Sequence, residues 1–225
     1  MDKKNYASLK KFAQAQGIAL FGVADIASVK NDFRLSAKLI SRLDKAVCLG
    51  MRLSGSVLDE ITSAPTRLYF HHYRTINAAL DQAALKTANF IQDQGFNALP
   101  IPASIILDWE KQQGHLSHKK IGVLAGLGWI GRNNLLVNKQ LGSQFRLATI
   151  LTDMPLEPDK PVKDTCGECR LCVKMCPAQA IKEDAADFEH TRCFEKLKEF
   201  QKNKLVDQYI CGVCVNVCKG KLNHG

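Results

Sequence analysis

The chain has 225 residues, 46% of them hydrophobic, and a formal net charge of +9. A chain of this length and composition is globular, with one or two domains and a substantial core. No apolar run is long enough to span a bilayer and no segment has low complexity, so neither a helical membrane protein nor a disordered one is expected.

The charge is unevenly distributed. Residues 1–150 hold 19 Lys and Arg against 10 Asp and Glu, whereas residues 151–225 hold 12 of each. The basic excess either keeps the protein soluble or serves an anionic ligand. Residues 1–16 are rich in lysine and amphipathic, without the apolar segment of a secretory signal, so we expect a cytoplasmic protein and no membrane association.

The first hundred residues mix helical and extended patterns. Residues Tyr6, Leu9 and Phe12 form a stripe with helical spacing, and Pro65 and Gly95 bracket a long amphipathic stretch. In chain order we predict a helix at 5–16, a strand at 18–24, a helix near 35–43, a strand at 46–53, a long helix at 66–94 and a strand at 96–101.

The rest of the chain continues the mixture. We predict a helix at 117–127, a hairpin of strands 134–138 and 145–152 that turns at Gly142, and a helix at 191–205. The lysines of this last helix are read as a solvated face and not as a nucleic-acid site. Because helices and strands do not strictly alternate, the fold class is α+β.

Three prolines, at 155, 158 and 161, punctuate an extended connector. They suggest a division into an α+β domain at residues 1–154, which is expected to bind a cofactor, a connector at 155–165 and a cysteine-rich module at 166–225.

Eight of the nine cysteines lie in that module. The first block has the spacing C-x2-C-x2-C-x3-C-P, starting at Cys166 and ending at Pro177. Each iron corner of a [4Fe–4S] cube takes one soft thiolate, and in two-cluster ferredoxins the fourth cysteine of this pattern ligates the other cluster. The second block, Cys211-x2-Cys214-x3-Cys218, repeats the x3 spacing, so Cys218 is expected to cross back to the first cluster.

The predicted ligands are therefore Cys166, Cys169, Cys172 and Cys218 for one cluster, and Cys176, Cys193, Cys211 and Cys214 for the other. The pattern departs from the usual one twice. Cys193 supplies its corner from eighteen residues upstream of Cys211, and Lys219 follows the last cysteine in place of proline.

Two other uses of the cysteines were weighed. Structural zinc prefers paired C-x2-C hooks separated by a longer loop, and three cysteines at successive x2 spacings crowd a tetrahedral site. Disulfides need an oxidising compartment. The ninth cysteine, Cys48, lies in an apolar run and is read as a buried core residue.

The segment Gly126-x-Gly128-x-x-Gly131 matches the dinucleotide-binding fingerprint in form only. That fingerprint follows a strand and opens a helix, whereas here a helix precedes and a strand follows. Two readings remain open: a tight turn that brings backbone against a bulky flat cofactor, with Trp129 beside it, or a glycine turn that packs a helix on a strand.

The segments AGLGWIGRNN (125–134) and LTDMPL (151–156), together with the cysteine blocks, resemble the epoxyqueuosine reductase family, which is related to the reductive dehalogenases. The resemblance covers about residues 117–218. It implies an N-terminal α+β domain similar to the nitroreductase-like, corrinoid-binding fold, followed by a bacterial ferredoxin-like module with two [4Fe–4S] clusters. In the family, electrons pass through the clusters to cobalamin, and the tRNA-modifying members remove an epoxide oxygen from a modified base.

The resemblance suggests cofactor-binding roles for Gly126, Gly128, Trp129, Gly131, Arg132 and Tyr73, with His72, Ser117 and His118 as further pocket residues. It also shows departures. The tRNA-modifying enzymes place an aspartate proton donor about thirteen residues before the alanine of AGLGWIG; Gln112 stands here, with Asp108 and Glu110 out of register. The chain ends seven residues after Cys218, which would make it a short member without the tRNA-associated domain.

The sequence therefore predicts a reductase that passes electrons through two clusters to a cofactor, cobalamin first, or to a substrate; the catalytic residues are unknown. The alternative is a non-catalytic electron carrier or a reductive activator of a partner, for instance a corrinoid protein. Ferredoxin or flavodoxin is the expected donor. A tRNA-binding role is disfavoured because no RNA-binding motif interleaves aromatic and basic residues. The pair His115 and His118 could share a metal, but both are read as helix-surface histidines.

Overall fold

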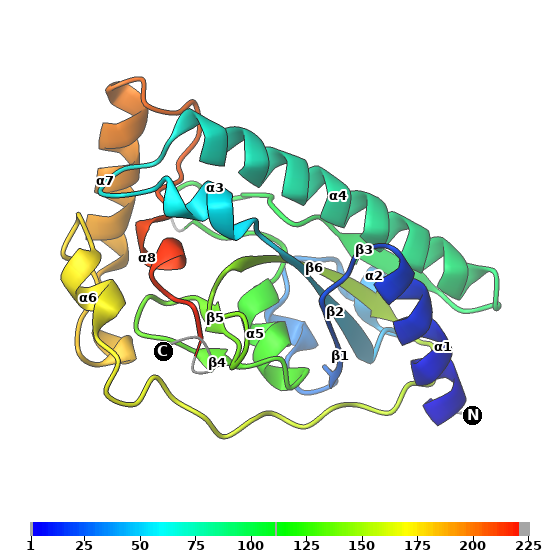
Figure 1. The fold of residues 1–225 in the computed structure, drawn as a ribbon. Helices are drawn as coiled ribbons and strands as arrows, with labels where there is room; N and C mark the ends of the chain where they lie inside the picture. The colour runs from blue at the N-terminus through cyan, green and yellow to red at the C-terminus, as the bar shows by residue number, and fades with distance from the viewer. Residues whose placement is uncertain (1, 111, 221–225) are drawn as a thin grey trace. The chain divides into compact units, whose positions relative to one another are not determined.

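The computed structural model describes residues 2–110 and 112–220. They form two compact units, each built from three stretches of chain. Unit 1 comprises residues 1–51, 76–127 and 146–162, and unit 2 comprises residues 52–75, 128–145 and 163–225. Helices and strands are mixed, as the α+β prediction requires (Figure 1). No helix within the described ranges is both long and apolar enough to cross a bilayer.

The helices and strands of the first part of the chain are α1 (Asp2–Ala15), β1 (Leu20–Asp25), the 3-10 turn η1 (Lys30–Asp32), α2 (Ala37–Ile40), β2 (Lys45–Arg52), α3 (Gly55–Asp59), α4 (Arg67–Gln92) and β3 (Ala98–Ile101). They agree with the predicted elements, except that the helix expected near 35–43 is one turn long and α3 was not predicted.

The elements that follow are α5 (His118–Leu124), β4 (Trp129–Ile130), β5 (Leu136–Val137), β6 (Phe145–Thr152), α6 (Leu171–Met175), η2 (Ala185–Asp187), α7 (His190–Lys202) and α8 (Val213–Asn216). Helix α5 is shorter than predicted because the chain turns into a positive φ of 68° at Gly126.

The predicted hairpin between 134–138 and 145–152 is wrong. Strand β5 pairs with β4, and β6 joins a different sheet. The reason is local: the amide of Asn134 donates to Gly131 O (2.9 Å) and the amide of Gly131 donates to Leu135 O (2.9 Å), so the chain closes a tighter hairpin one turn earlier.

Unit 1 is organised around a four-stranded sheet in the order β1-β2-β6-β3. Strands β1 and β2 are antiparallel, with Val23 opposite Val47, and β3 and β6 are antiparallel. Side chains from α1, α4 and the sheet form one core, which includes Leu9, Leu80 and Ile150, each fully buried. Burial of these apolar side chains is the main source of stability for this unit.

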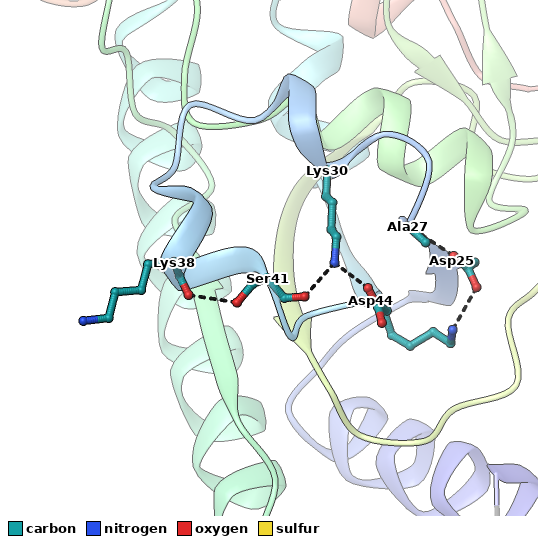
Figure 2. Close-up of polar contacts among 7 residues, drawn as sticks. Asp25, Ala27, Lys30, Lys38, Ser41 and Asp44 are labelled. Atoms are coloured by element: carbon teal, nitrogen blue, oxygen red, sulfur yellow. Dashed lines mark hydrogen bonds and ion pairs between the residues drawn. The ribbon is translucent and has the colours of Figure 1, made fainter.

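Polar contacts fasten the segment between β1 and β2. The Nζ atom of Lys30 donates to Ser41 O (2.9 Å) and to Asp44 Oδ1 (2.6 Å), and thereby ties η1 to the turn after α2 (Figure 2). At the ends of the two strands, Lys45 Nζ lies 2.8 Å from Asp25 Oδ2, in agreement with their register.

The proline-containing connector is attached to unit 1. The Asp159 amide donates to Val23 O (2.8 Å), its carboxylate accepts from the Val23 amide (2.8 Å), and the hydroxyl of Tyr6 donates to the same carboxylate (3.1 Å). Burial, together with the charge of Asp159, raises the pKa of Tyr6 to about 12. The connector therefore covers the otherwise open edge of β1.

Unit 2 contains short helices and all eight clustered cysteines. The division differs from the predicted boundaries, because residues 52–75 and 128–145 belong to the cysteine unit and not to the N-terminal one. Polar contacts explain why these two segments belong with the cysteines. Lys219 pairs with Asp59 (3.4 Å), the side chain of Asn216 donates to Ile61 O (2.9 Å), and Gln144 donates to Asn216 O (2.7 Å).

Candidate iron–sulfur site

The first predicted set of thiols converges on one cavity. This cavity of unit 2 is lined by Cys166, Cys169, Cys172 and Cys218, with Trp129 and Arg132 among its other walls. Burial raises the pKa of Cys172 to about 12, and the thiols of Cys218, Cys166 and Cys169 add to that rise. Cys218 therefore lies beside the C-x2-C-x2-C loop although some fifty residues separate them in the chain.

The second set gathers in the same way. Burial raises the pKa of Cys193 to about 11, and Cys176 contributes. Burial also raises the pKa of Cys211 to about 11, with contributions from Cys193 and Cys176, while Lys196 acts in the opposite direction. Burial holds the pKa of Cys214 well above its usual range, and Cys211 is the largest of its charged neighbours. These four thiols come from the end of α6, from α7 and from the start of α8.

The two sets adjoin each other. Cys172, on α6, is among the neighbours that raise the pKa of Cys214, on α8, and helices α6 and α8 pack together. The members of each predicted set are therefore neighbours, and Cys218 lies with the first set although it belongs to the last block. Among the described residues, however, no three His, Cys, Asp or Glu side chains are arranged so that they could hold a metal ion, so the ligand assignment stays a prediction.

Hydrogen bonds to sulfur accompany both sets. The amide of Ala180 donates to Cys176 Sγ (3.4 Å). Burial raises the pKa of Cys218, whereas hydrogen bonds from the Ser143 side chain and backbone lower it. Such donors stabilise a thiolate and influence the potential of a cluster that it holds. Sequence reasoning missed both donors. Ala180 follows Cys176 by only four residues, whereas Ser143 is 75 residues from Cys218 and no local motif indicates it.

The three motif glycines lie close to the chain's own atoms. A Cβ at Gly128 would lie 2.0 Å from Val137 O, and one at Gly131 would lie 2.5 Å from the Val137 side chain and 3.4 Å from Cys166 Sγ. At Gly126, where φ is 68°, it would lie 2.6 Å from Lys160 O. Close packing of backbone against backbone therefore explains all three positions, in agreement with the second reading of this turn.

Arg132 fastens the cysteine loop. Its guanidinium donates to three carbonyl oxygens: Glu183 O (2.6 Å), Gly167 O (3.0 Å) and Cys169 O (3.2 Å). The neighbouring Trp129 is 7% exposed and lines the cavity of the first set. Both residues are therefore placed at the cysteines, where they shape the surroundings of the first set.

The other predicted pocket residues are divided between the units. Tyr73 is buried in unit 2 against Tyr69 (6.1 Å between ring centroids), and His72 Nε2 accepts from the Ser54 amide (2.9 Å). In unit 1, Ser117 caps α5 by accepting from the amide of Lys120 (3.4 Å). The hydrogen bonds of His72 and Ser117 are local and structural.

His118 is not a surface histidine as predicted. Its Nε2 lies 2.9 Å from Pro102 O and its Nδ1 lies 2.8 Å from Thr149 Oγ1. A carbonyl only accepts, so Nε2 carries the proton and Nδ1 accepts from the threonine hydroxyl. Burial lowers the pKa of His118 to about 4, with a further lowering from Arg146. The imidazole is therefore neutral at pH 7.

The position of the family's proton donor lies at the end of a small hairpin. Asp108 and Gln113 form an isolated antiparallel bridge, and Gln112 has a positive φ of 50°. The Nε2 atom of Gln112 is buried without a hydrogen-bond partner in the described structure. Asp108 pairs with Arg34 (3.4 Å). Neither side chain is a free carboxylic acid.

Residues 165–221 match the family described as a 4Fe-4S double cluster binding domain. Over nearly its whole length, the chain is similar to an epoxyqueuosine reductase of Cyclobacterium marinum: the two are 28% identical, over 96% of this chain and 79% of that protein. A second protein of that name, from Leadbetterella byssophila, is 34% identical over 42% of this chain. The match covers only 33% of the length of that protein.

Two solved structures have a similar fold. An epoxyqueuosine reductase from Streptococcus thermophilus superposes with a TM-score of 0.69 at 19% identity and covers 96% of this chain and 66% of its own. A reductive dehalogenase whose structure suggests a mechanism for B12-dependent dehalogenation superposes with a TM-score of 0.65 at 17% identity. The superposed part covers 78% of this chain and 25% of the dehalogenase chain. The predicted resemblance to epoxyqueuosine reductases is thus confirmed, and residues 165–221 match a domain that binds two 4Fe-4S clusters in its family.

Proposed function

We propose that the chain is an iron–sulfur oxidoreductase in which each of the two thiol sets holds one [4Fe–4S] cluster. The observation that carries the proposal is that Cys166, Cys169, Cys172 and Cys218 line one cavity, while the thiols of the second set are neighbours of one another. The donor set fits the cofactor, because iron in such clusters takes four soft thiolates and both sets receive hydrogen bonds at sulfur. When bound, these clusters supply one-electron transfer.

The protein's own residues prepare the two sites for the clusters. Burial raises the pKa of Cys172, Cys193, Cys211 and Cys214, so these four thiols are protonated in an iron-free chain and each must lose its proton when it binds iron. Arg132 holds the loop carbonyls in place, and Trp129 reduces water access to the first set. Both effects give the first thiol set a fixed environment with little water. For the protein as a whole we propose a reducing compartment, the cytoplasm.

The acceptor of the electrons is proposed to lie in unit 1, as a cofactor or a substrate. Cobalamin is the first candidate, and it is supported only by the likeness to the reductive dehalogenase and by the family resemblance. The motif glycines add no support, because other protein atoms occupy the Cβ position of all three. We therefore derive no reaction step through cobalamin.

A second function is favoured by one observation. The residue at the family's donor position is Gln112, and the nearby Asp108 is engaged by Arg34. An amide is not a general acid, so a proton-coupled reduction of the epoxyqueuosine type lacks its usual donor. The chain would then be an electron carrier, or a reductive activator of a partner such as a corrinoid protein.

The test is anaerobic purification of the full chain with iron, sulfide and zinc analysis. About eight irons per chain are expected if both cubes are present, with a brown sample and reduced-cluster EPR signals after dithionite. A well-folded, colourless sample, or one that contains only zinc, would overturn the proposal.

The same sample separates the two functions. Cob(II)alamin is added anaerobically and its cobalt EPR spectrum is recorded. A shifted spectrum supports a corrinoid-linked reductase, whereas an unchanged spectrum at saturating cobalamin favours the electron carrier.

A further inference from the structure

Helix α7 has one face toward the second thiol set and the opposite face toward water. Cys193 belongs to that set, and Phe200, two turns later on the same side of the helix, is buried. At 100° per residue, Lys198 and Lys202 lie on the opposite side, and both are exposed. One helix diameter, about 10 Å, therefore separates the exposed lysines from the cysteine side.

Unit 2 is electrostatically polarised along its sequence. Residues 190–204, which span α7 and its C-terminal end, contain five basic and two acidic residues. Residues 164–189, which contain most of the first thiol set, hold six acidic and three basic residues. The segment around Cys193 thus has a net positive charge, and segment 164–189 has a net negative one.

The acidic residues of α7 are already occupied. Glu195 pairs with Lys198 (2.9 Å) and Glu199 pairs with Lys196 (2.6 Å). Within the described residues, no ion pair involves Lys202 or Lys204, which lie at the end of the helix and just beyond it. The local excess of positive charge is therefore concentrated there.

An apolar surface adjoins these charges. Leu205 follows Lys204 and is 38% exposed. The rings of Phe194 and Tyr209 meet edge to face at 5.3 Å, and Lys198 Nζ lies 4.5 Å from the Phe194 ring centroid. Docking surfaces commonly combine a small apolar area with a charged rim that steers the partner.

We propose that the α7 basic face, defined by Lys198, Lys202 and Lys204, is the docking surface for an acidic one-electron carrier protein. The inference rests on the proposed function, because it assigns that carrier as electron donor to the second thiol set. In each encounter the carrier loses one electron and the cluster held by Cys193 and its three companions gains it; no proton or atom is exchanged. The acidic segment 164–189 repels the same carrier and so orients it.

The test uses the cluster-loaded full chain and an acidic flavodoxin. The dissociation constant of the complex between the chain and oxidised flavodoxin is measured as a function of salt concentration. The rate at which reduced flavodoxin reduces the clusters is measured by stopped flow. In the double variant Lys202→Glu, Lys204→Glu we expect binding weaker by about tenfold or more and a similarly slower second-order rate, both converging with the parent at high salt. The neutral pair Lys202→Gln, Lys204→Gln falls between.

Lys86→Glu, an exposed position on α4, is the matched control and is expected to bind like the parent. Iron content and reduction by dithionite report whether each variant is intact. If these are normal while flavodoxin binding is unaffected by the double variant or by salt, the docking surface is wrong and the proposed function stands. If the parent itself holds no iron, the proposed function fails instead.

A nucleic acid is the competing partner for a basic helix. If transfer RNA is retained at modest salt, and the double variant loses that retention but keeps its flavodoxin kinetics, the face binds nucleic acid and our proposal is overturned.

Discussion

The two units are stabilised in different ways. Unit 1 has a four-stranded sheet, the larger part of helix α4 (residues 76–92) and a continuous core with many fully buried side chains. In unit 2, helix α6 has five residues and α8 has four, both far below the length at which a helix is stable by itself. Unit 1 is stabilised mainly by burying apolar surface. Unit 2 also buries apolar side chains, such as Ile61 and Val213, but we expect its short helices to depend in addition on what the eight thiols bind.

The largest expected effect comes from the thiols. Cys214→Ser should remove one ligand of the second set and reduce the iron content from about eight to about four per chain. Because a bound metal centre contributes folding free energy directly, hydrogen exchange should increase throughout residues 163–220 and little in the sheet of unit 1.

Cys48→Ser is the matched control, since Cys48 is buried in β2 of unit 1. It is expected to keep its full iron content. Equal iron in the two variants would contradict the contrast between the units.

A core substitution should show the reverse pattern. Ile150 is fully buried in β6, and Ile150→Ala is expected to reduce the free energy of unfolding of unit 1 by about 3 kcal/mol, with Ile150→Val costing about 1 kcal/mol. Urea unfolding under anaerobic conditions measures the change. Loss of iron from Ile150→Val at temperatures where it is folded would show that the two units are not independently stabilised.

Arg132 offers an intermediate case, since it acts in unit 2 without being a ligand. Arg132→Lys keeps the charge but replaces a planar group with several donors by a single ammonium that does not span three carbonyls. We expect a loss of about 2 kcal/mol in local stability and faster release of iron to a chelator. Release at the parent rate would remove Arg132 from the support of the cysteine loop.

The smallest effect is a pH dependence in unit 1. The pKa of His118 is lowered from 6.5 to about 4, so below pH 6.5 the unfolded chain binds a proton that the folded one does not. Stability is therefore complete above pH 6.5 and falls as the pH decreases toward 4, by about 2 kcal/mol between pH 7 and pH 5.

Hydrogen exchange in β6, compared between the parent and His118→Gln, measures this slope apart from any acid sensitivity of the clusters. The variant is expected to lose most of the slope. An unchanged slope would assign it to another group.

The histidine and the hairpin show where sequence reasoning failed. His118 has helical spacing with His115 and gives no sign of burial; its partners, Pro102 and Thr149, come from two other segments. The hairpin prediction used Gly142 as its turn, although the amide of the next residue, Ser143, donates to Cys218 O (3.1 Å), a partner that lies some seventy-five residues away.

The cysteine spacing predicted two sets of thiols by the two-cluster ferredoxin pattern, and the structure places Cys218 beside the first block as that pattern requires. The periodicity of α4 and the apolar runs of β1 and β2 likewise located those elements, since they reflect local burial. Only the tertiary structure decided that residues 52–75 and 128–145 belong with the cysteines, and that backbone fills the space beside the motif glycines. Those outcomes depend on contacts between distant segments, which no local pattern encodes.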